Sequence, residues 1–395
     1  MNKAATLNKP YQTSAAFRSV REAALDQSPI SGLTHCYYRY PARFSPAFAR
    51  AAIAEFSGPG DVVLDPYMGG GTTVLESMVA GRRPVGTDIN SLAVFVTRAK
   101  TDRLNPREVR AVEDWASFTV PDLRCSIPMP ELDRAEPRNM TLPAVRHLRK
   151  TIALCIESIE DELPTARARR VARCAVLNVG QWALNGRKRI PTAAEFRKRT
   201  QTTTFEMLAG ASVLREALLD APQSPSNPVL RELDAERIHT DSKIVAAGPI
   251  DLVVTSPPYP GIHMLYHRWQ VDGRKETDAP YWIAAKNDGC GTAYYNFADR
   301  RRSSEDRYFE KSERSFGAVR QIMRTGAVMV QLIAFSHPQR QLRRYLSMME
   351  RAGFSELRDD GARRTWRPVP GRKWHASTKG DIPSSREVML LHEAV

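Results

Sequence analysis

Residues 62–73 read Val-Val-Leu-Asp-Pro-Tyr-Met-Gly-Gly-Gly-Thr-Thr, and this stretch decides the fold. The apolar run 62–64 predicts a buried strand that ends on Asp65. The glycines that follow turn the chain into a helix, which we expect over residues 72–80. A strand that turns through glycines into a helix is the first half of a β-loop-α-β unit, so the stretch predicts an open α/β sheet.

The same stretch predicts a binding site. Bare backbone at the glycines can approach a ligand closely, because side chains that would clash are absent. The carboxylate of Asp65 can meet a positive group, such as the amino group of a bound amino acid. A second short strand, 84–87, ends on Asp88, where such folds hydrogen-bond a ribose diol. The loop lacks the Gly-Lys-Ser/Thr end of a phosphate-binding loop, which argues against an ATPase.

A second motif follows the apolar run 250–254, which predicts another buried strand. Thr255-Ser256-Pro257-Pro258-Tyr259 comes directly after it, at the end of a strand where open α/β sheets bind ligands. Two prolines stiffen the turn and remove two N–H donors, which leaves acceptors. The Ser256 hydroxyl and the Pro257 carbonyl could hold both N–H bonds of an aromatic amino group, and Tyr259 offers a face for a base to stack on.

Both motifs resemble those of the amino-methylating DNA methyltransferases. Residues 65–73 are similar to the family's Asp-Pro-Phe-x-Gly-Ser-Gly-Thr-Thr cofactor motif, and residues 256–259 to its Ser-Pro-Pro-Tyr catalytic motif. Upstream, His35 and residues 40–44 resemble the family's His-x-Tyr-Pro-Ala-Lys-Phe element, which closes over the methionine end of the cofactor. Gly70 and Arg43 depart mildly from the family's Ser and Lys.

The resemblance implies a Rossmann-like S-adenosylmethionine-dependent methyltransferase fold, with a mostly parallel seven-stranded sheet. It implies base flipping and direct in-line methyl transfer to duplex DNA, with no covalent intermediate. The implied catalytic residues are Ser256, Pro257, Pro258 and Tyr259. The implied residues for S-adenosylmethionine are Tyr40, Pro41, Phe44, Asp65, Pro66, Gly69, Gly71, Thr72, Thr73, Asp88 and Asp241. Asp241 lies in His239-Thr240-Asp241-Ser242, which resembles the element that contacts the cofactor's adenine; an Asp that starts a surface turn is the alternative.

The leading Ser256 favours cytosine N4 as the target, since Asp or Asn is commoner in the adenine-N6 enzymes of the family. The order of elements differs from many Ser-Pro-Pro-Tyr relatives, in which the catalytic loop comes first. Adenine N6, an RNA base, and a non-catalytic DNA-binding protein on the same fold therefore stay open as alternatives. None of the five cysteines follows a proline, which disfavours cytosine-C5 methylation. A role in restriction-modification, with a restriction or defence protein as partner, is one setting for such an enzyme.

The chain divides into four predicted parts. Residues 1–33 form a flexible arm, 34–104 the cofactor half, 105–236 a helical insertion that could recognise DNA, and 237–395 the catalytic half. Within the insertion we expect helices at 144–163, 165–184 and 203–220, and a strand at 237–239 after it. Beyond the catalytic loop we expect helices at 308–325 and 339–352, and strands at 326–335, 354–358 and 386–392.

Composition fits a basic globular protein. Lys and Arg number 58 against 44 Asp and Glu, a net charge of +14 that suits a polyanion such as nucleic acid. The chain has no apolar run long enough for a membrane span and no secretory signal core, so a cytoplasmic location is expected. The five scattered cysteines predict reduced thiols and no metal site.

Three basic segments could contact DNA, and the first could equally be a solvated helix face. The first lies in the insertion, the second follows the catalytic loop, and the third is near the C-terminus. The residues singled out are Arg169, Arg170, Arg187, Lys188, Arg189, His267, Arg268, Arg372 and Lys373.

Overall fold

The computed structural model describes most of the chain. The described residues are 14–28, 30–40, 44–124, 126–129, 136–223, 226–260, 268–273, 275–288, 303–359, 363–368 and 386–395. Pro41, His267, Arg372 and Lys373, which the sequence singled out, lie outside them.

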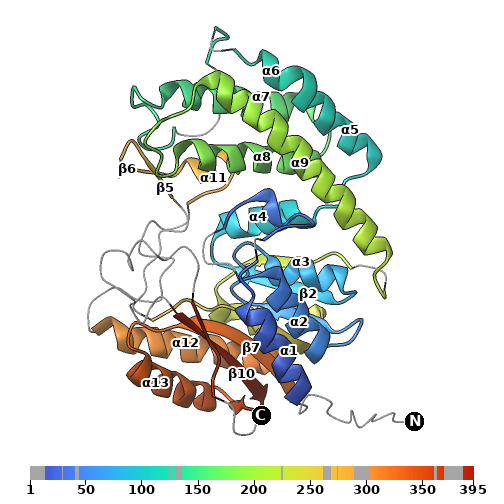
Figure 1. Ribbon diagram of the computed structural model, residues 1–395, viewed down its shortest axis with the longest axis vertical. Coiled ribbons are helices and arrows are strands. Elements are labelled where there is room, and N and C mark those ends of the chain that lie inside the picture. Colours follow the sequence, from blue (N-terminus) through green and yellow to red (C-terminus); the bar gives the residue numbers. More distant parts are fainter. Residues whose placement is uncertain are drawn as a thin grey trace.

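The core of the fold is a mostly parallel sheet in the order β3-β2-β1-β4-β7-β10-β8, with β9 paired to β10 (Figure 1). Adjacent strands are parallel from β3 to β7, whereas β10 runs antiparallel to β7, β8 and β9. The predicted Rossmann-like α/β fold is therefore confirmed, with β9 as an eighth strand beside the seven of the main path. The strands of this sheet are β1 Val62–Asp65, β2 Arg83–Asp88, β3 Val229–Glu232, β4 Ile250–Thr255, β7 Met323–Ala334, β8 Phe354–Leu357, β9 Trp366–Pro368 and β10 Arg386–Ala394.

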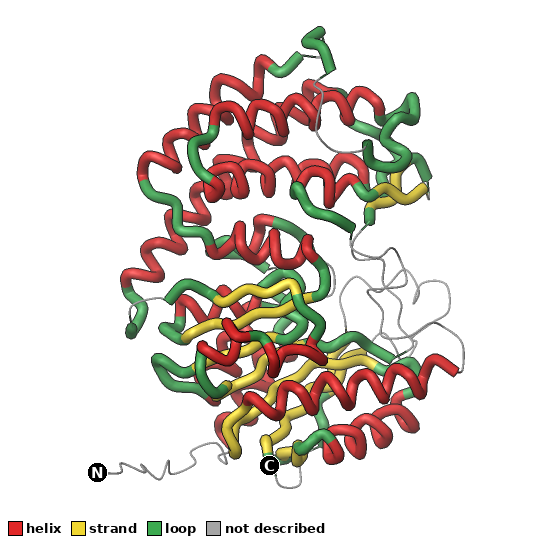
Figure 2. Tube along the Cα trace, turned by 180° about the vertical axis from the view of Figure 1, so that it is seen from behind, coloured by secondary structure: helices red, strands yellow, loops and turns green. Residues whose placement is uncertain are grey.

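Helices cover both faces of the sheet, as Figure 2 shows. Alternate residues of the buried strands point to opposite faces. Val63 and Val254 pack under α1 and α2, while Leu64 and Val253 pack under α12 and α13. This is why the strands read as continuous apolar runs. The helices nearest the sheet are α1 Ser14–Leu25, α2 Pro46–Phe56, α3 Thr72–Val79, α4 Ser91–Thr101, α10 Ser242–Ala246, α12 Ser303–Ile322 and α13 Pro338–Arg351, with the short turns η2 His35–Tyr37 and η4 Ala235–Thr240.

A helical lobe stands beyond the sheet (Figure 1). It is built from α5 Pro106–Asp114, η3 Trp115–Thr119, α6 Val120–Asp122, α7 Arg146–Glu162, α8 Ala166–Leu184 and α9 Ala193–Leu219. A large apolar core holds these helices together and extends to Trp269 and Trp282, which come after the catalytic loop in sequence.

The segment 268–288 therefore belongs to the helical lobe rather than to the catalytic half. It forms the hairpin of β5 Trp269–Val271 and β6 Lys275–Thr277, followed by α11 Ala279–Ile283. A side-chain carbon added at Gly180 of α8 would lie 2.8 Å from the Trp269 ring. Only a glycine lets the hairpin pack this closely on the helix.

Several sequence-based boundaries were wrong. Helix α9 begins at Ala193, ten residues before the expected start, because Thr192 and Glu195 form a capping box there. The strand expected at 237–239 is part of the 3₁₀ turn η4, and the sheet strand β3 lies earlier. Part of the expected flexible arm is helix α1, whose Val20 is fully buried against α2 and the sheet.

In the part of the chain that the structure describes, no helix is long and apolar enough to cross a membrane.

One buried histidine gives the fold a pH dependence. His392 of β10 is 1% exposed, and neither ring nitrogen has a hydrogen-bond partner among the described residues. Burial lowers the pKa of His392 to about 4, because the charged ring would lose its water. The unfolded chain binds a proton near the ordinary pKa of 6.5, whereas the folded chain does not, so His392 destabilises the fold as pH falls from 7 toward 4.

We therefore expect His392→Leu to remove part of the acid sensitivity. Between pH 7 and pH 5 the wild type should lose roughly 2 kcal/mol of unfolding free energy relative to this variant. Urea unfolding curves of both proteins at several pH values measure the difference. Parallel pH profiles for the two proteins would show that His392 does not titrate in this way.

Candidate active site

The site is built where parallel strands end. Strands β1, β2 and β4 are neighbours, and Asp65, Asp88 and Thr255 are their last residues. Because the carboxyl ends of parallel strands meet at one edge of a sheet, the cofactor motif and the catalytic motif come together there.

Asp65 joins the two motifs directly. Its side chain is 1% exposed and accepts hydrogen bonds from the Thr255 hydroxyl at 2.7 Å and from the Tyr67 amide at 3.1 Å. Burial raises the pKa of Asp65 to about 7. Nearby, the Thr73 hydroxyl donates to the Val254 carbonyl at 3.0 Å, which makes a second link between the motifs.

Asp88 holds the glycine loop. Its carboxylate accepts from the Gly69 amide at 3.0 Å and from the Asn90 amide at 2.9 Å. Burial raises the pKa of Asp88 as well, to about 6. The Thr87 hydroxyl donates to the Pro66 carbonyl at the start of the loop. At the other end of the loop, Gly71 is the N-cap residue of α3.

Asn90 connects three segments at this edge and was not anticipated from the sequence. Its side-chain nitrogen donates to the Tyr40 hydroxyl at 3.1 Å, and its side-chain oxygen accepts from the Tyr281 hydroxyl at 3.1 Å. Tyr281 comes from α11 of the helical lobe, 191 residues away in sequence. No local pattern relates residues that far apart, so only the fold reveals the contact.

Tyr40 lies against the glycine loop. A side-chain carbon at Gly69 would lie 3.2 Å from the Tyr40 ring, and one at Gly70 would lie 2.9 Å from the Tyr40 Cβ, so Tyr40 needs bare backbone beneath it. Phe44, also expected at the cofactor, packs edge-on against Phe48 at 5.4 Å in the core under α2. The structure thus brings Tyr40 to the loop and places Phe44 in the core.

The residues present fit S-adenosylmethionine. Asp65 is a buried carboxylate and Asp88 a half-buried one; the pKa values of both are raised, and a neighbouring positive group would stabilise their charged forms. The glycine loop between them lies against the side chains of Tyr40 and Thr97. Thr72 and Thr73, at the start of α3, are buried behind it.

The catalytic loop is held at several points. The Ser256 hydroxyl donates to the Leu332 carbonyl of β7 at 2.9 Å and lies 2.7 Å from the Tyr259 hydroxyl. The Tyr308 hydroxyl of α12 donates to the Pro258 carbonyl at 2.7 Å. Ser256 is half-buried and Tyr259 is 8% exposed. Ser256, at the end of β4, is thus held by two neighbours and is still only partly buried.

Sequence reasoning also missed an ion pair behind this loop. The Tyr259 hydroxyl donates to Glu387 at 2.7 Å, and Glu387 accepts two hydrogen bonds from Arg367, at 2.7 and 2.9 Å. Both residues lie in paired C-terminal strands, β9 and β10. A charged residue at the start of a strand gives no sign in the sequence of what it faces.

In this structure Asp241 starts a turn, which was the alternative to a cofactor contact. One oxygen accepts from Arg231 at 2.8 Å, and the other caps α10 by accepting from the amides of Lys243 and Ile244. A contact between Asp241 and the cofactor stays a prediction.

The basic residues of the insertion fall into two sets. In α8, Arg169 pairs with Glu160 at 3.1 Å and Arg170 with Asp102 at 2.6 Å, so carboxylates of the protein already neutralise them. The loop after α8 carries Arg187, which lies over the Trp182 ring at 4.3 Å, and the exposed Lys188. It also carries Arg189, which pairs with Glu195 at 2.9 Å but keeps 69% of its side chain exposed.

Arg268 differs from its predicted role. Its side chain is 7% exposed and lies 2.7 Å from Asp288 and 3.3 Å from Glu276. It holds the segment 268–288 together and is not presented at the surface.

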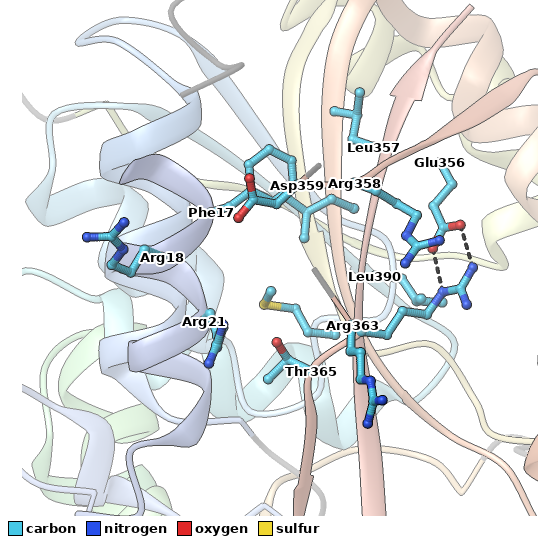
Figure 3. Close-up of a pocket in the computed structure, with 13 residues that line it drawn as sticks. Phe17, Arg18, Arg21, Glu356, Leu357, Arg358, Asp359, Arg363, Thr365 and Leu390 are labelled. Atoms are coloured by element: carbon cyan, nitrogen blue, oxygen red, sulfur yellow. Dashed lines mark hydrogen bonds and ion pairs between the residues drawn. The ribbon is translucent and has the colours of Figure 1, made fainter. Parts of the chain in front are cut away.

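A separate cavity of about 200 Å³ lies between α1 and the edge formed by β8 and β10 (Figure 3). Arg18, Arg21 and Arg363 are among the residues around it, together with Glu356, which pairs with Arg364 at 2.7 Å. None of its lining residues belongs to the glycine loop or the catalytic loop.

Comparison with known proteins gives a family match to the N-terminal part of the chain. Residues 6–96 match the family model of N6 and N4 methyltransferases, described as DNA methylase. The chain is 36% identical to the type II methyltransferase M.MvaI of Kocuria varians over 86 residues, which is 21% of this chain and 19% of that protein. It is 38% identical to the DNA adenine methyltransferase YhdJ of Escherichia coli over 55 residues, 14% of this chain and 19% of that protein.

The matched region spans about a fifth of each of these relatives. Among solved structures, the rRNA methyltransferase aviRa of Streptomyces viridochromogenes aligns over 93% of this chain and 89% of its own, with 11% identity and a TM-score of 0.35. A score that low leaves the fold to rest on the strand order described above. Residues 6–96 of this chain are thus similar to the amino-methylating DNA methylases, and S-adenosylmethionine is the cofactor.

Proposed function

We propose that this protein transfers a methyl group from S-adenosylmethionine to an exocyclic amino nitrogen of a flipped base in DNA, and that the base is cytosine, methylated at N4. The observation that carries the proposal is the hydrogen bond between Thr255 and Asp65. It puts Ser256, the next residue, beside the acid that would hold the charged end of the cofactor.

The chemistry needs little more than this placement. The amino nitrogen of a base is a poor nucleophile, because its lone pair is delocalised into the ring. Ser256 and the Pro257 carbonyl would accept its two N–H bonds and aim the lone pair at the methyl group. S-adenosylmethionine supplies that group as an electrophile on a sulfonium, so positioning and electrostatics account for the rate.

The choice of cytosine rests on Ser256, as in the N4 enzymes that the loop resembles. The relatives include proteins described as type II methyltransferases and one described as a DNA adenine methyltransferase. Adenine N6 and RNA are therefore outcomes of the test below. A cytoplasmic location, and a restriction or defence partner, belong to the same proposal.

Methyl transfer can be measured with labelled cofactor and unmethylated genomic DNA. We expect label in N4-methylcytosine after digestion to nucleosides, and a loss of at least about 100-fold in kcat for Ser256→Ala, because its acceptor is removed. Label only in N6-methyladenine would overturn the choice of base. Label in RNA but in no DNA would overturn the substrate, and an active Ser256→Ala variant would overturn the role of Ser256.

Asp65 should make cofactor binding depend on pH. Below its pKa of about 7, the carboxyl must release a proton before it can face the cofactor's ammonium group. Affinity should therefore fall as pH falls, by roughly eightfold from pH 7.5 to pH 6. Calorimetric titration of S-adenosylmethionine measures this, and Asp65→Asn is the control, which should bind more weakly with a flatter pH profile. An equally steep profile in Asp65→Asn would place the titrating group elsewhere.

The two sets of arginines should behave differently toward DNA. Replacing Arg187, Lys188 and Arg189 together by Ala should weaken binding and lower the slope of log K against log salt by roughly two to three, since up to three phosphate contacts are lost. Arg169→Ala with Arg170→Ala is the matched control, which should lower the unfolding free energy but leave the slope unchanged. The reverse pattern would place the DNA on α8 instead.

A further inference from the structure

The directions of two hydroxyl protons at the catalytic loop, those of Ser256 and Tyr259, affect what the loop can bind. Three short contacts run in a chain: Ser256 to the Leu332 carbonyl at 2.9 Å, Ser256 to Tyr259 at 2.7 Å, and Tyr259 to Glu387 at 2.7 Å. The two hydroxyls bring only two protons to these three contacts. The direction of each proton decides how many lone pairs of the Ser256 oxygen are left to accept hydrogen bonds from a substrate.

The ion pair of Glu387 and Arg367 sets these directions. The two side chains are 4% and 11% exposed, and Arg367 donates to one carboxylate oxygen of Glu387 through two nitrogens. Arg367 is in turn fixed by the Ala24 carbonyl at the end of α1, which it reaches at 3.2 Å. The other oxygen of Glu387 is the one that accepts from Tyr259.

A carboxylate only accepts, so the Tyr259 proton points toward Glu387. The Tyr259 oxygen is then an acceptor for Ser256. The single proton of Ser256 is shared between Tyr259 and the Leu332 carbonyl, and the lone pairs of Ser256 face away from both. This arrangement accounts for all three short contacts with two protons.

We propose that Glu387 is a positioning residue for methyl transfer: it draws the Tyr259 proton away from Ser256, so that the Ser256 oxygen meets the substrate amino group as a pure acceptor. The inference rests on the proposed function of the loop. Arg367 keeps Glu387 in place, and helix α1 keeps Arg367 in place.

The variant Glu387→Gln reverses the chain with almost no change in shape. Arg367 can only donate, so it holds the amide oxygen of the new side chain, and the amide nitrogen then faces Tyr259. That nitrogen donates to the Tyr259 oxygen and turns the Tyr259 proton toward Ser256. One of the two lone pairs of the Ser256 oxygen then accepts from Tyr259, which leaves a single, weaker acceptor for the substrate amino group.

The test compares kcat in four proteins at saturating cofactor and DNA. Glu387→Gln should lower kcat roughly tenfold or more, with the dissociation constants of cofactor and DNA little changed. Tyr259→Phe should lower kcat less, because phenylalanine has no hydroxyl proton that could point at the Ser256 oxygen. Adding Tyr259→Phe to Glu387→Gln should restore kcat to the level of Tyr259→Phe alone. A double variant no more active than Glu387→Gln would overturn the proposal, because a merely structural Glu387 gives losses that add.

Glu356→Gln is the matched control. Glu356 pairs with Arg364 through two 2.7 Å hydrogen bonds and lies on β8, which like β9 is paired to β10, but it has no contact with the loop. Its kcat should equal that of the wild type. A loss in this variant as large as in Glu387→Gln would show a general effect of breaking a C-terminal ion pair, and would overturn the proposal.

A second measurement needs no methyl transfer. In a cycle of Tyr259→Phe and Glu387→Ala, the two changes should be coupled in the unfolding equilibrium by about fivefold or more, as expected for a buried hydrogen bond to a carboxylate. No coupling would overturn the proposal. A wild type that methylates no nucleic acid would overturn the proposed function instead, and the cycle would still decide whether Glu387 holds Tyr259.

Discussion

The hydrogen bond from Thr255 to the buried Asp65 joins two segments that lie 190 residues apart in sequence. Each strand alone could end in many ways, but parallel pairing of β1 with β4 brings both ends to one edge of the sheet. The carboxylate is buried by this pairing, and burial is what raises its pKa. The same contact therefore fixes the geometry of the two motifs and makes Asp65 receptive to a positive ligand.

The remaining contacts support this edge from both sides. On the sheet side, β7 accepts from Ser256, while β10 holds Tyr259 through Glu387. On the lobe side, Tyr281 reaches Asn90 behind the second strand end. The catalytic loop thus touches elements from the C-terminal half, and the cofactor edge touches the helical lobe.

Much of this could be predicted from the sequence, because strong local patterns specify it. Continuous apolar runs predicted the strands β1, β4 and β7. The two motifs located the edge where the site is built. Three features were beyond local patterns: the pairing of Glu387 with Tyr259, the contact of Tyr281 with Asn90, and the return of 268–288 to the lobe. Each depends on tertiary packing between distant segments.

The sequence also could not show which basic residues are paired with acids in the fold. Arg169 and Arg170 read as part of a positive run, yet acids distant in the sequence or on a neighbouring helix pair with them. Charge along a sequence counts residues, whereas charge on a surface depends on which of them have partners in the fold. Among the predicted DNA contacts that the structure describes, the loop of Arg187 to Arg189 is the one that stays exposed to solvent, as the sequence indicated.

The packing of Trp269 against Gly180 has a consequence for how such proteins diverge. The helical lobe is encoded by two separate stretches, with the catalytic loop between them. Recombination that exchanged only the longer stretch would leave the old hairpin facing a foreign helix, where any residue larger than glycine would collide with the tryptophan ring. The lobe can therefore be inherited or engineered as a unit only when both stretches move together.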